Sequence, residues 1–416
     1  MQGLSRAAFA AGLLGPLGLL GLLGLLGLAR PAHAAPLALD LPGALARAHQ
    51  LSPVAAQTRA TLAAADGAIV AADVRFAANP ELEAGLGPRF VTPRLYDIDA
   101  RISQDLGLGR RGPRQTLARA ERTRATAAGD AELRELDREV ATAFYEALYA
   151  ERALAVATSA EDLARRASDV ADRKRRAGDA TDLEVDLARA ASGRARAATL
   201  AAASARATAL GQLAAQIGTG ADETLVVEGD LHVELPEPDA LRRAADTRAD
   251  LRELDAARHV AGAEATVATA NARPDLGIWL GYRREGGESI VLGGLRLTLP
   301  AWNRGAGERA IAIAHERGAE ETAAATRRAA LAQLGAAHTA YVAARDAVAL
   351  LERDVLPALD ESEKLLGKSV DAGQLAVSEY LVARQQILDG RREYLDRLLA
   401  LARAATAARY LSGVPQ

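Results

Sequence analysis

The chain contains the stretch AGDATDLEVDLAR at residues 177–189 and a second stretch, AGQLAVSEYLVAR, at residues 372–384. Both begin with Ala-Gly, carry a glutamate six residues after the glycine, and end with Ala-Arg. Long alanine-rich sequence with a helical pattern flanks each stretch. Because glycine accepts the positive φ that a chain reversal requires, each stretch predicts the tip of a helical hairpin. Two matching tips predict two matching halves.

The sequence on either side of the tips repeats as well. Residues 41–78 and 238–272 each predict one helix that ends near a proline, and residues of about 112–217 and 307–411 predict two long helical hairpins. The outgoing arm of the first hairpin would be about 100 Å long at 1.5 Å per residue. In the second hairpin, Pro357 must kink or divide the outgoing arm. The sequence therefore predicts a tandem duplication, with repeats at 35–228 and 229–416.

Between the shorter helix and the long hairpin of each half, the apolar period changes to two. Alternation predicts strands at about 81–90 and 96–106 in the first half, and at about 275–284 and 289–299 in the second. Their length suits tilted strands that cross a bilayer. Unpaired strand edges in lipid cost several kcal/mol per backbone group, so two hairpins alone cannot span a membrane. Either they pack on helices in water or several copies pool their strands, and the long arms favour a pooled, hollow tube.

The composition excludes several classes of protein. The 416 residues are 50% hydrophobic and 25% charged, and the formal net charge of −3 comes with no basic block for nucleic acid. The chain has no cysteine and its only methionine is the initiator, which excludes thiolate and thioether metal ligands. An apolar run at 7–28 followed by Ala32-His33-Ala34 predicts a secretory signal peptide at residues 1–34. The alternative is a retained transmembrane helix.

The sequence motifs that would indicate catalysis, cofactor binding or metal binding are absent or lack the required context. Residues 107–112 read GLGRRG, which matches the glycine pattern of a dinucleotide site, but the helix that follows is far too long for a βαβ unit. The six histidines lack metal-ligand spacing, and no Ser-His-Asp arrangement occurs. We therefore predict no enzyme activity, no cofactor and no metal site.

Acidic residues are concentrated at the tips. Glu184 and Glu379 occupy equivalent positions, and Asp182 and Asp186 flank the first of them. Such carboxylates form either a ring that selects cations at the narrow end of a tube or an ordinary helix N-terminus, where the dipole favours acids. The basic run at 173–176 is either their partner or a solvated surface. The sequence leaves both questions open.

Taken together, the signal peptide, the duplicated halves, the hairpins and the tips resemble the TolC family of outer-membrane efflux channels. Local features of that family are Arg273-Pro274-Asp275-Leu276 and Leu299-Pro300 followed by Asn303-Arg304-Gly305. The resemblance implies a mainly α fold with a small β-barrel contribution. A homotrimer would form a 12-stranded barrel in the outer membrane of a Gram-negative bacterium and a helical tunnel in the periplasm. A periplasmic adaptor (a membrane-fusion protein) and an inner-membrane pump would be its partners.

Alignment of the tips carries the aperture acids of the family to Glu379 and Glu184, while Val382 stands where some members have a second acid. Adaptor docking carries over to Gly178, Leu183, Gly373 and Leu375. Residues 103–114 are similar to the strand-to-helix junction of the heavy-metal (CzcC-like) branch, although that branch usually has Gly-Lys-Arg where this chain has Gly-Arg-Arg. This likeness implies export of divalent metal cations. The alternatives are an exit duct for drugs or type I protein secretion, and, in another class, a periplasmic coiled-coil scaffold.

Overall fold

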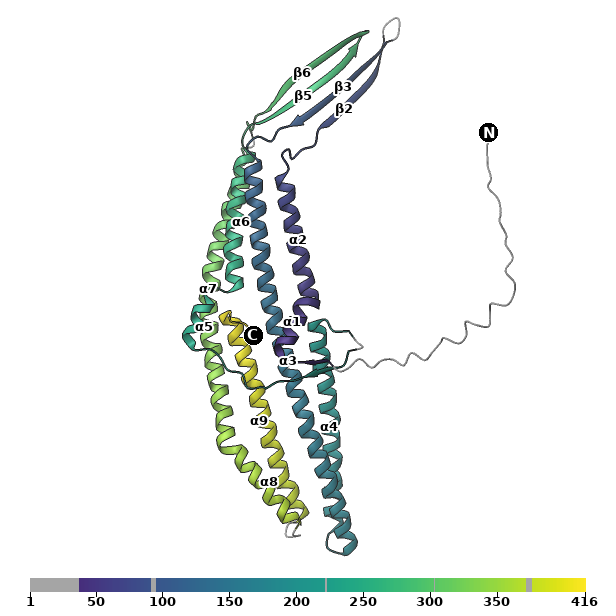
Figure 1. Cartoon of the computed structure of the whole chain (residues 1–416), viewed down its shortest axis with the longest axis vertical. Helices are drawn as coiled ribbons and strands as arrows, with labels where there is room; N and C mark the ends of the chain where they lie inside the picture. The colour runs from purple at the N-terminus through teal and green to yellow at the C-terminus, as the bar shows by residue number, and fades with distance from the viewer. Residues whose placement is uncertain (1–36, 91–94, 221–222, 303, 372–375) are drawn as a thin grey trace, which may run out of the picture.

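The computed structural model describes residues 37–90, 95–220, 223–302, 304–371 and 376–416. A four-stranded sheet stands at one end of a long bundle of helices, and the helices of two hairpins reach to the other end (Figure 1). The described part is mainly helical, as the sequence predicts. The signal peptide expected at residues 1–34 lies outside the described residues.

The prediction of long helical hairpins is confirmed. In the first hairpin, α3 (Arg111–Ala177) runs for 67 residues, which is about 100 Å, and α4 (Asp182–Ile217) returns beside it. The second hairpin consists of α7 (Ala306–Leu350), α8 (Leu356–Asp371) and α9 (Val377–Ser412). Glycines with positive φ end α3, α4 and α9, because a left-handed residue closes a helix without strain only when it lacks a Cβ atom.

A short π-helix at Leu351–Val355 separates α7 from α8. Pro357 lies two residues beyond it, and a proline ring collides with the carbonyl four residues earlier, which here belongs to Arg353. The wider π turn accommodates this collision, and the arm bends in this region (Figure 1). The interruption predicted at Pro357 is therefore present.

The expectation of one continuous helix at 41–78, and of another at 238–272, is wrong. The structure has α1 (Leu41–Leu51) and α2 (Pro53–Asp73) in the first region, and α5 (Pro238–Ala245) and α6 (Ala249–Asn271) in the second. Ser52 is extended, and its hydroxyl accepts a hydrogen bond from the Ala55 amide at 3.1 Å, which caps α2. Arg248 is also extended and buried, and its guanidinium donates to Asp250 and to the Leu411 carbonyl at 2.9 Å.

The two predicted β-hairpins are present and join into one antiparallel sheet. Its strands are β2 (Glu81–Arg89), β3 (Leu95–Asp105), β5 (Asp275–Glu285) and β6 (Glu288–Thr298), hydrogen-bonded in that order. The hairpins meet where β3 pairs with β5, with Ile102 opposite Leu280. Because side chains alternate across a strand, this register gives the sheet two distinct faces.

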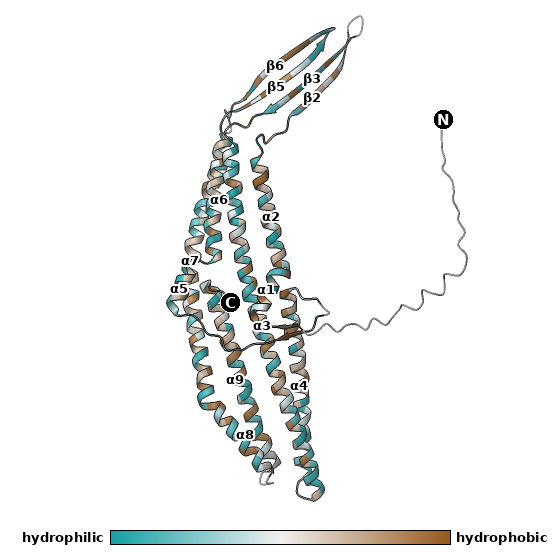
Figure 2. Cartoon of the chain, in the orientation of Figure 1, coloured by the Kyte–Doolittle hydropathy of each residue, from teal (hydrophilic) through white to brown (hydrophobic). Residues whose placement is uncertain are grey.

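One face, which we call the apolar face, consists of exposed hydrophobic side chains. It carries Leu82, Leu86, Ile98, Ile102, Ile278, Leu280, Tyr282, Val291, Leu295 and Leu297. The opposite or polar face carries most of the charges of the sheet, together with Trp279, Ile290 and Leu292. Figure 2 shows hydrophobic (brown) and hydrophilic (teal) residues in the strands of this sheet. A sheet exposed on both faces with opposite character is built for two different environments.

A second, parallel sheet of two short strands was missed from the sequence. It pairs β1 (Leu37–Leu39) with β4 (Leu225–Val227) near the middle of the bundle. The largest cluster of buried side chains lies there as well, and Phe144, Leu213 and Leu398 are almost completely buried in it. Alanines fill much of the remaining contact surface and let the helix axes approach closely. This cluster fixes the two hairpins to each other.

None of the described helices combines the length and the hydropathy needed to cross a bilayer.

Replacing Leu213 by alanine should lower the free energy of unfolding by about 2–5 kcal/mol, because a fully buried side chain is removed from the central cluster. Leu200→Ala is the matched control, since Leu200 lies on the same helix but is 66% exposed. The midpoint temperature of helix loss, followed by circular dichroism in detergent, should fall for Leu213→Ala and stay close to wild type for the control. Equal midpoints for both variants would contradict this assignment of the core.

Candidate functional site

The first tip is a tight reversal around Gly178. This residue has a φ of 86°, and its amide donates to the Arg175 carbonyl at 3.1 Å. The next amide, that of Asp179, donates to the Lys174 carbonyl at 2.8 Å. These bonds satisfy carbonyls that the end of α3 would otherwise leave without partners. Gly178 therefore serves as the predicted turn, and a residue with a Cβ atom would be strained there.

Glu184 lies at the start of α4, where it forms a capping box with Thr181. The Thr181 hydroxyl accepts a bond from the Glu184 amide at 3.3 Å, and the Glu184 carboxylate accepts bonds from the Thr181 amide at 2.8 Å and hydroxyl at 2.9 Å. These bonds to Thr181 lower the pKa of Glu184. The carboxylate thus stabilises the helix N-terminus. The sequence signal, threonine followed three residues later by glutamate, was present but overlooked.

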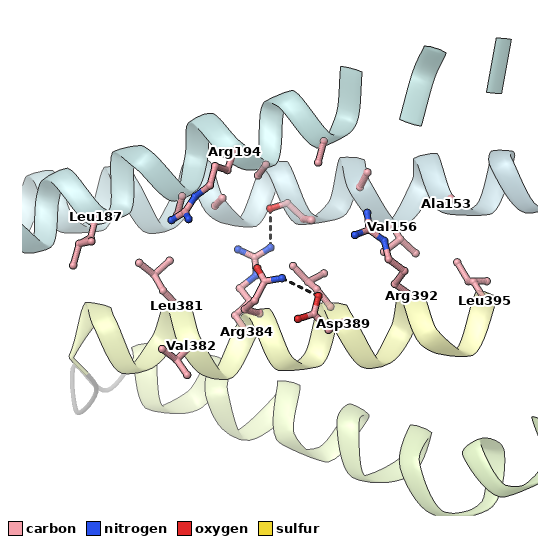
Figure 3. A pocket seen from close by; sticks show the side chains of 18 of the residues that line it. Ala153, Val156, Leu187, Arg194, Leu381, Val382, Arg384, Asp389, Arg392 and Leu395 are labelled. Carbon is pink, nitrogen blue, oxygen red and sulfur yellow. Dashed lines mark hydrogen bonds between the residues drawn. The ribbon is translucent and has the colours of Figure 1, made fainter. Parts of the chain in front are cut away.

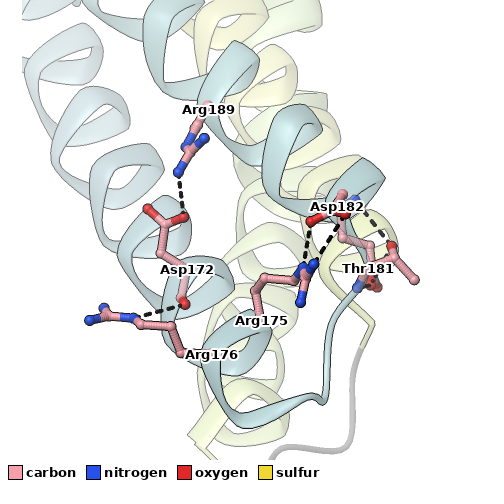
Figure 4. A network of polar contacts seen from close by, with 7 residues as sticks. Asp172, Arg175, Arg176, Thr181, Asp182 and Arg189 are labelled. Carbon is pink, nitrogen blue, oxygen red and sulfur yellow. Dashed lines mark hydrogen bonds and ion pairs between the residues drawn. The ribbon is translucent and has the colours of Figure 1, made fainter.

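Asp182 pairs with the basic run of α3. The Arg175 guanidinium donates to both carboxylate oxygens of Asp182, at 2.5 and 3.1 Å, and this partner lowers the pKa of the carboxyl. Nearby, Arg189 of α4 donates to Asp172 of α3 at 2.8 Å (Figure 4). One member of the run at 173–176 therefore does pair with a tip acid. These bonds hold the two arms of the tip together.

The remaining tip residues predicted from sequence are placed as follows. Leu183 is 68% exposed, and Asp186 is exposed on the same helix. Glu379 is exposed in the first turn of α9, where the helix dipole favours an acid. Gly373 and Leu375 lie outside the described residues. Exposed acids and an exposed leucine are thus available at this end of the molecule for contacts with other chains.

The two hairpins touch near their tips. Ala171, Val185 and Ala188 form a small buried cluster in the first hairpin, and Leu381 of α9 packs against it. The structure therefore places α4, which carries Glu184, against α9, which carries Glu379.

Above this contact, a groove of about 620 Å³ runs between α3, α4 and α9 (Figure 3). Alanines and leucines line much of it, together with Arg194, Arg384 and Arg392. Val382 is 62% exposed and also lines the groove. The wall of the groove is therefore apolar at Val382.

Arg384, which links the second hairpin to the first, was not identified from the sequence. It is only 6% exposed, and its guanidinium donates to the Ala160 carbonyl of α3 at 2.7 Å. Burial lowers the pKa of Arg384, and Tyr380 opposes this effect. Arg384 closes the second repeated stretch as Arg189 closes the first, and both side chains bond to α3. The shared Ala-Arg ending was the signal that could have identified both.

The described residues contain no group of three or more His, Asp or Glu side chains that could hold a metal ion. Of the acids described at the tips, Glu184 caps a helix, Asp182 forms an ion pair, and Asp186 and Glu379 are exposed.

The comparisons with known proteins concern the fold. The sequence matches no protein-family model and no protein among the curated sequences compared with it. The structure is similar to the open state of the MtrE outer membrane channel of Neisseria gonorrhoeae, with a TM-score of 0.74, 18% identity, and coverage of 90% of this chain and 89% of that one. It is also similar to the outer membrane protein VceC of Vibrio cholerae, with a TM-score of 0.70, 19% identity, and coverage of 90% and 96%.

A third similar structure is that of CusC, a protein studied for conformational changes that accompany folding and transmembrane channel formation. Its TM-score is 0.73 at 16% identity, and the match covers 90% of this chain and 92% of that one. At such identities the likeness concerns the architecture. The chain has the fold of these outer membrane channels, which confirms the predicted fold class.

Replacing Thr181 by alanine should open the first tip, because the cap of α4 loses its hydroxyl. We expect amide hydrogen exchange in residues 184–187, whose amides are hydrogen-bonded at the start of α4, to become roughly five-fold faster. Thr208→Ala is the matched control, since Thr208 lies within the same helix and bonds only the Ser204 carbonyl one turn earlier. Exchange at the tip that is the same in Thr181→Ala as in wild type would contradict a stabilising capping box.

Proposed function

We propose that this chain is the outer-membrane channel of a tripartite efflux system, a passive exit duct and not an enzyme. The observation that carries the proposal is the four-stranded sheet, whose apolar face is exposed at the end of arms about 100 Å long. Such a face suits lipid, while the polar face suits water. The likeness to outer membrane channels over 90% of the chain supports the same conclusion. The location would be the outer membrane of a Gram-negative bacterium.

The edges of the sheet support a trimer. Among the strands that the structure describes, β2 and β6 each have a hydrogen-bonded neighbour on one side only. In lipid, backbone groups without partners cost several kcal/mol each. Three copies would join β6 of one chain to β2 of the next and close a 12-stranded barrel with the polar face inside. The helical hairpins would then line a tunnel in the periplasm.

The tips would meet the other components of the system. We place adaptor docking at Gly178, Leu183, Gly373 and Leu375, and the exposure of Leu183 supports this position. The adaptor would connect the duct to an inner-membrane pump that supplies the energy. No resident cofactor or metal is needed for passive transport.

The aperture would lie at the same end. Of the predicted gate acids, Glu184 and Asp182 already have bonds within the tip, whereas the Glu379 and Asp186 side chains are exposed and have no hydrogen bond or ion pair among the described residues. This difference favours Glu379 and Asp186 as the acids that face a central opening. An iris-like opening of the tips would have to break contacts between the hairpins, such as the bond from Arg384 to the Ala160 carbonyl.

For the substrate we propose divalent metal cations, on the resemblance of residues 103–114 to the heavy-metal (CzcC-like) branch. An exit duct for drugs or for type I protein secretion is the alternative, and a metal-sensitivity assay on a deletion strain separates the two. We also propose removal of residues 1–34 as a signal peptide and a tandem duplication with repeats at 35–228 and 229–416. The helix pairs α1–α2 and α5–α6, each followed by a hairpin of strands, support the duplication.

The purified full-length chain should form channels in planar lipid bilayers and run as a heat-modifiable trimer on gels. Glu379→Ala should raise the single-channel conductance by about two-fold, because contacts of the Glu379 ring between copies, which hold the aperture narrow, are removed. Glu393→Ala is the matched control, since Glu393 is an exposed acid further along the same helix that pairs with Arg397.

An unchanged conductance in Glu379→Ala, with open channels in both proteins, would contradict the gate assignment. A chain that is extracted without detergent and forms no trimer and no channel would contradict the proposed function and favour a periplasmic scaffold.

A further inference from the structure

Trp279 lies on the polar face of the sheet, in a position that two glycines make available. A Cβ atom on Gly294, which pairs with Trp279 across β5 and β6, would come within 2.8–2.9 Å of three indole atoms. A Cβ atom on Gly281 would come within 3.4 Å of the same ring. The glycines therefore let the indole lie flat against the sheet. Residues with larger side chains would force it away.

Arg101 of β3 stacks on this indole. Its guanidinium carbon is 4.7 Å from the centroid of the Trp279 ring, well within the range of a cation–π interaction. Across the register, Arg101 lies opposite Glu83 on β2 and Gly281 on β5. These side chains border a recess of about 190 Å³ on the polar face, with Asp99 and Arg283 beside them. The aromatic ring thus holds a positive charge in place near the middle of the strands.

The rest of the polar face is mainly acidic. Carboxylates on β2 and β3 outnumber the arginines whose side chains the structure describes on this face. The carboxylates are Glu81, Glu83, Asp97, Asp99 and Asp105, and the arginines are Arg101, Arg283 and Arg296. Arg296 forms an ion pair with Asp105 across Gly277, where a Cβ atom would lie 2.7 Å from the Asp105 carboxylate. Arg101 differs from Arg296 in being seated on an aromatic ring.

We propose that Arg101, held on Trp279, is a specificity-determining residue that limits the preference of the duct for cations. The inference rests on the proposed function, in which the polar face lines the barrel. Charged side chains on the wall of a pore set which ions enter it, and stacking on Trp279 keeps the charge of Arg101 at a defined place on this wall. Each copy in an oligomer would add one such arginine at the same height, opposite an excess of carboxylates.

The test is the reversal potential of the full-length channel in planar bilayers under a KCl gradient. Arg101→Gln should raise the permeability of K⁺ relative to Cl⁻ by at least about two-fold, because the acids of the face lose their opposing charge. Arg101→Lys keeps the charge and should retain a ratio close to wild type. Arg284→Gln is the matched control, since Arg284 is opposite Ile98 on the other face of β5 and should leave the ratio unchanged.

A ratio that is the same in Arg101→Gln as in wild type, measured on open channels, would overturn the inference and leave the proposed function intact. An equal rise in Arg284→Gln would also overturn it, because the effect would then not depend on the polar face. If the wild-type chain forms no channel, the proposed function fails and this inference fails with it. The trimer band on unheated gels verifies that each variant has assembled.

Discussion

Backbone hydrogen bonding at the edges of the four-stranded sheet is the constraint on which the rest of the structure depends. Within one chain, β3 and β5 are paired on both sides, whereas β2 and β6 have a neighbour on one side only among the described strands. The apolar face cannot stay in water at low cost, and open edges cannot stay in lipid. In the proposed assembly, association of several copies through β2 and β6 would satisfy both demands and would make the polar face the wall of an enclosed space.

The helical part follows from the same arrangement. Both hairpins leave the sheet at one end, and their outgoing arms, α3 on one side and α7 with α8 on the other, run toward the tips with α6 and α9 packed between them (Figure 1). Buried alanines keep the arms close, and the central cluster around Phe144 and Leu213 fixes them in register. At the far end, the capping box of Thr181 and Glu184 and the pair of Arg175 with Asp182 shape the first tip. Arg384 links the second hairpin to the first.

Much of the fold could be predicted from the sequence, because its signals are local. Period-two alternation identified the strands, and glycine between helical arms identified the turn at Gly178. The interruption near Ser52 had a local signal, a serine N-cap followed by Pro53, that was overlooked. The one near Arg248 was missed because a bond from its side chain to the distant Leu411 carbonyl is invisible in a helical pattern. The pairing of β1 with β4 also joins segments far apart in the chain. At the tips, residue types predicted the positions of the acids, but only the structure gives their partners.

The most direct test of the central claim is a disulfide between the edge strands, introduced into this cysteine-free chain. Ala84→Cys on β2 would be combined in turn with Val291→Cys, Gly293→Cys or Leu295→Cys on β6, which lie on the same face of the sheet as Ala84. Within one chain these strands lie three strand spacings apart, about 14 Å, which is too far for a disulfide. The account predicts that at least one pair gives a covalent trimer on denaturing gels after oxidation in membranes. Monomers alone from every pair would contradict it.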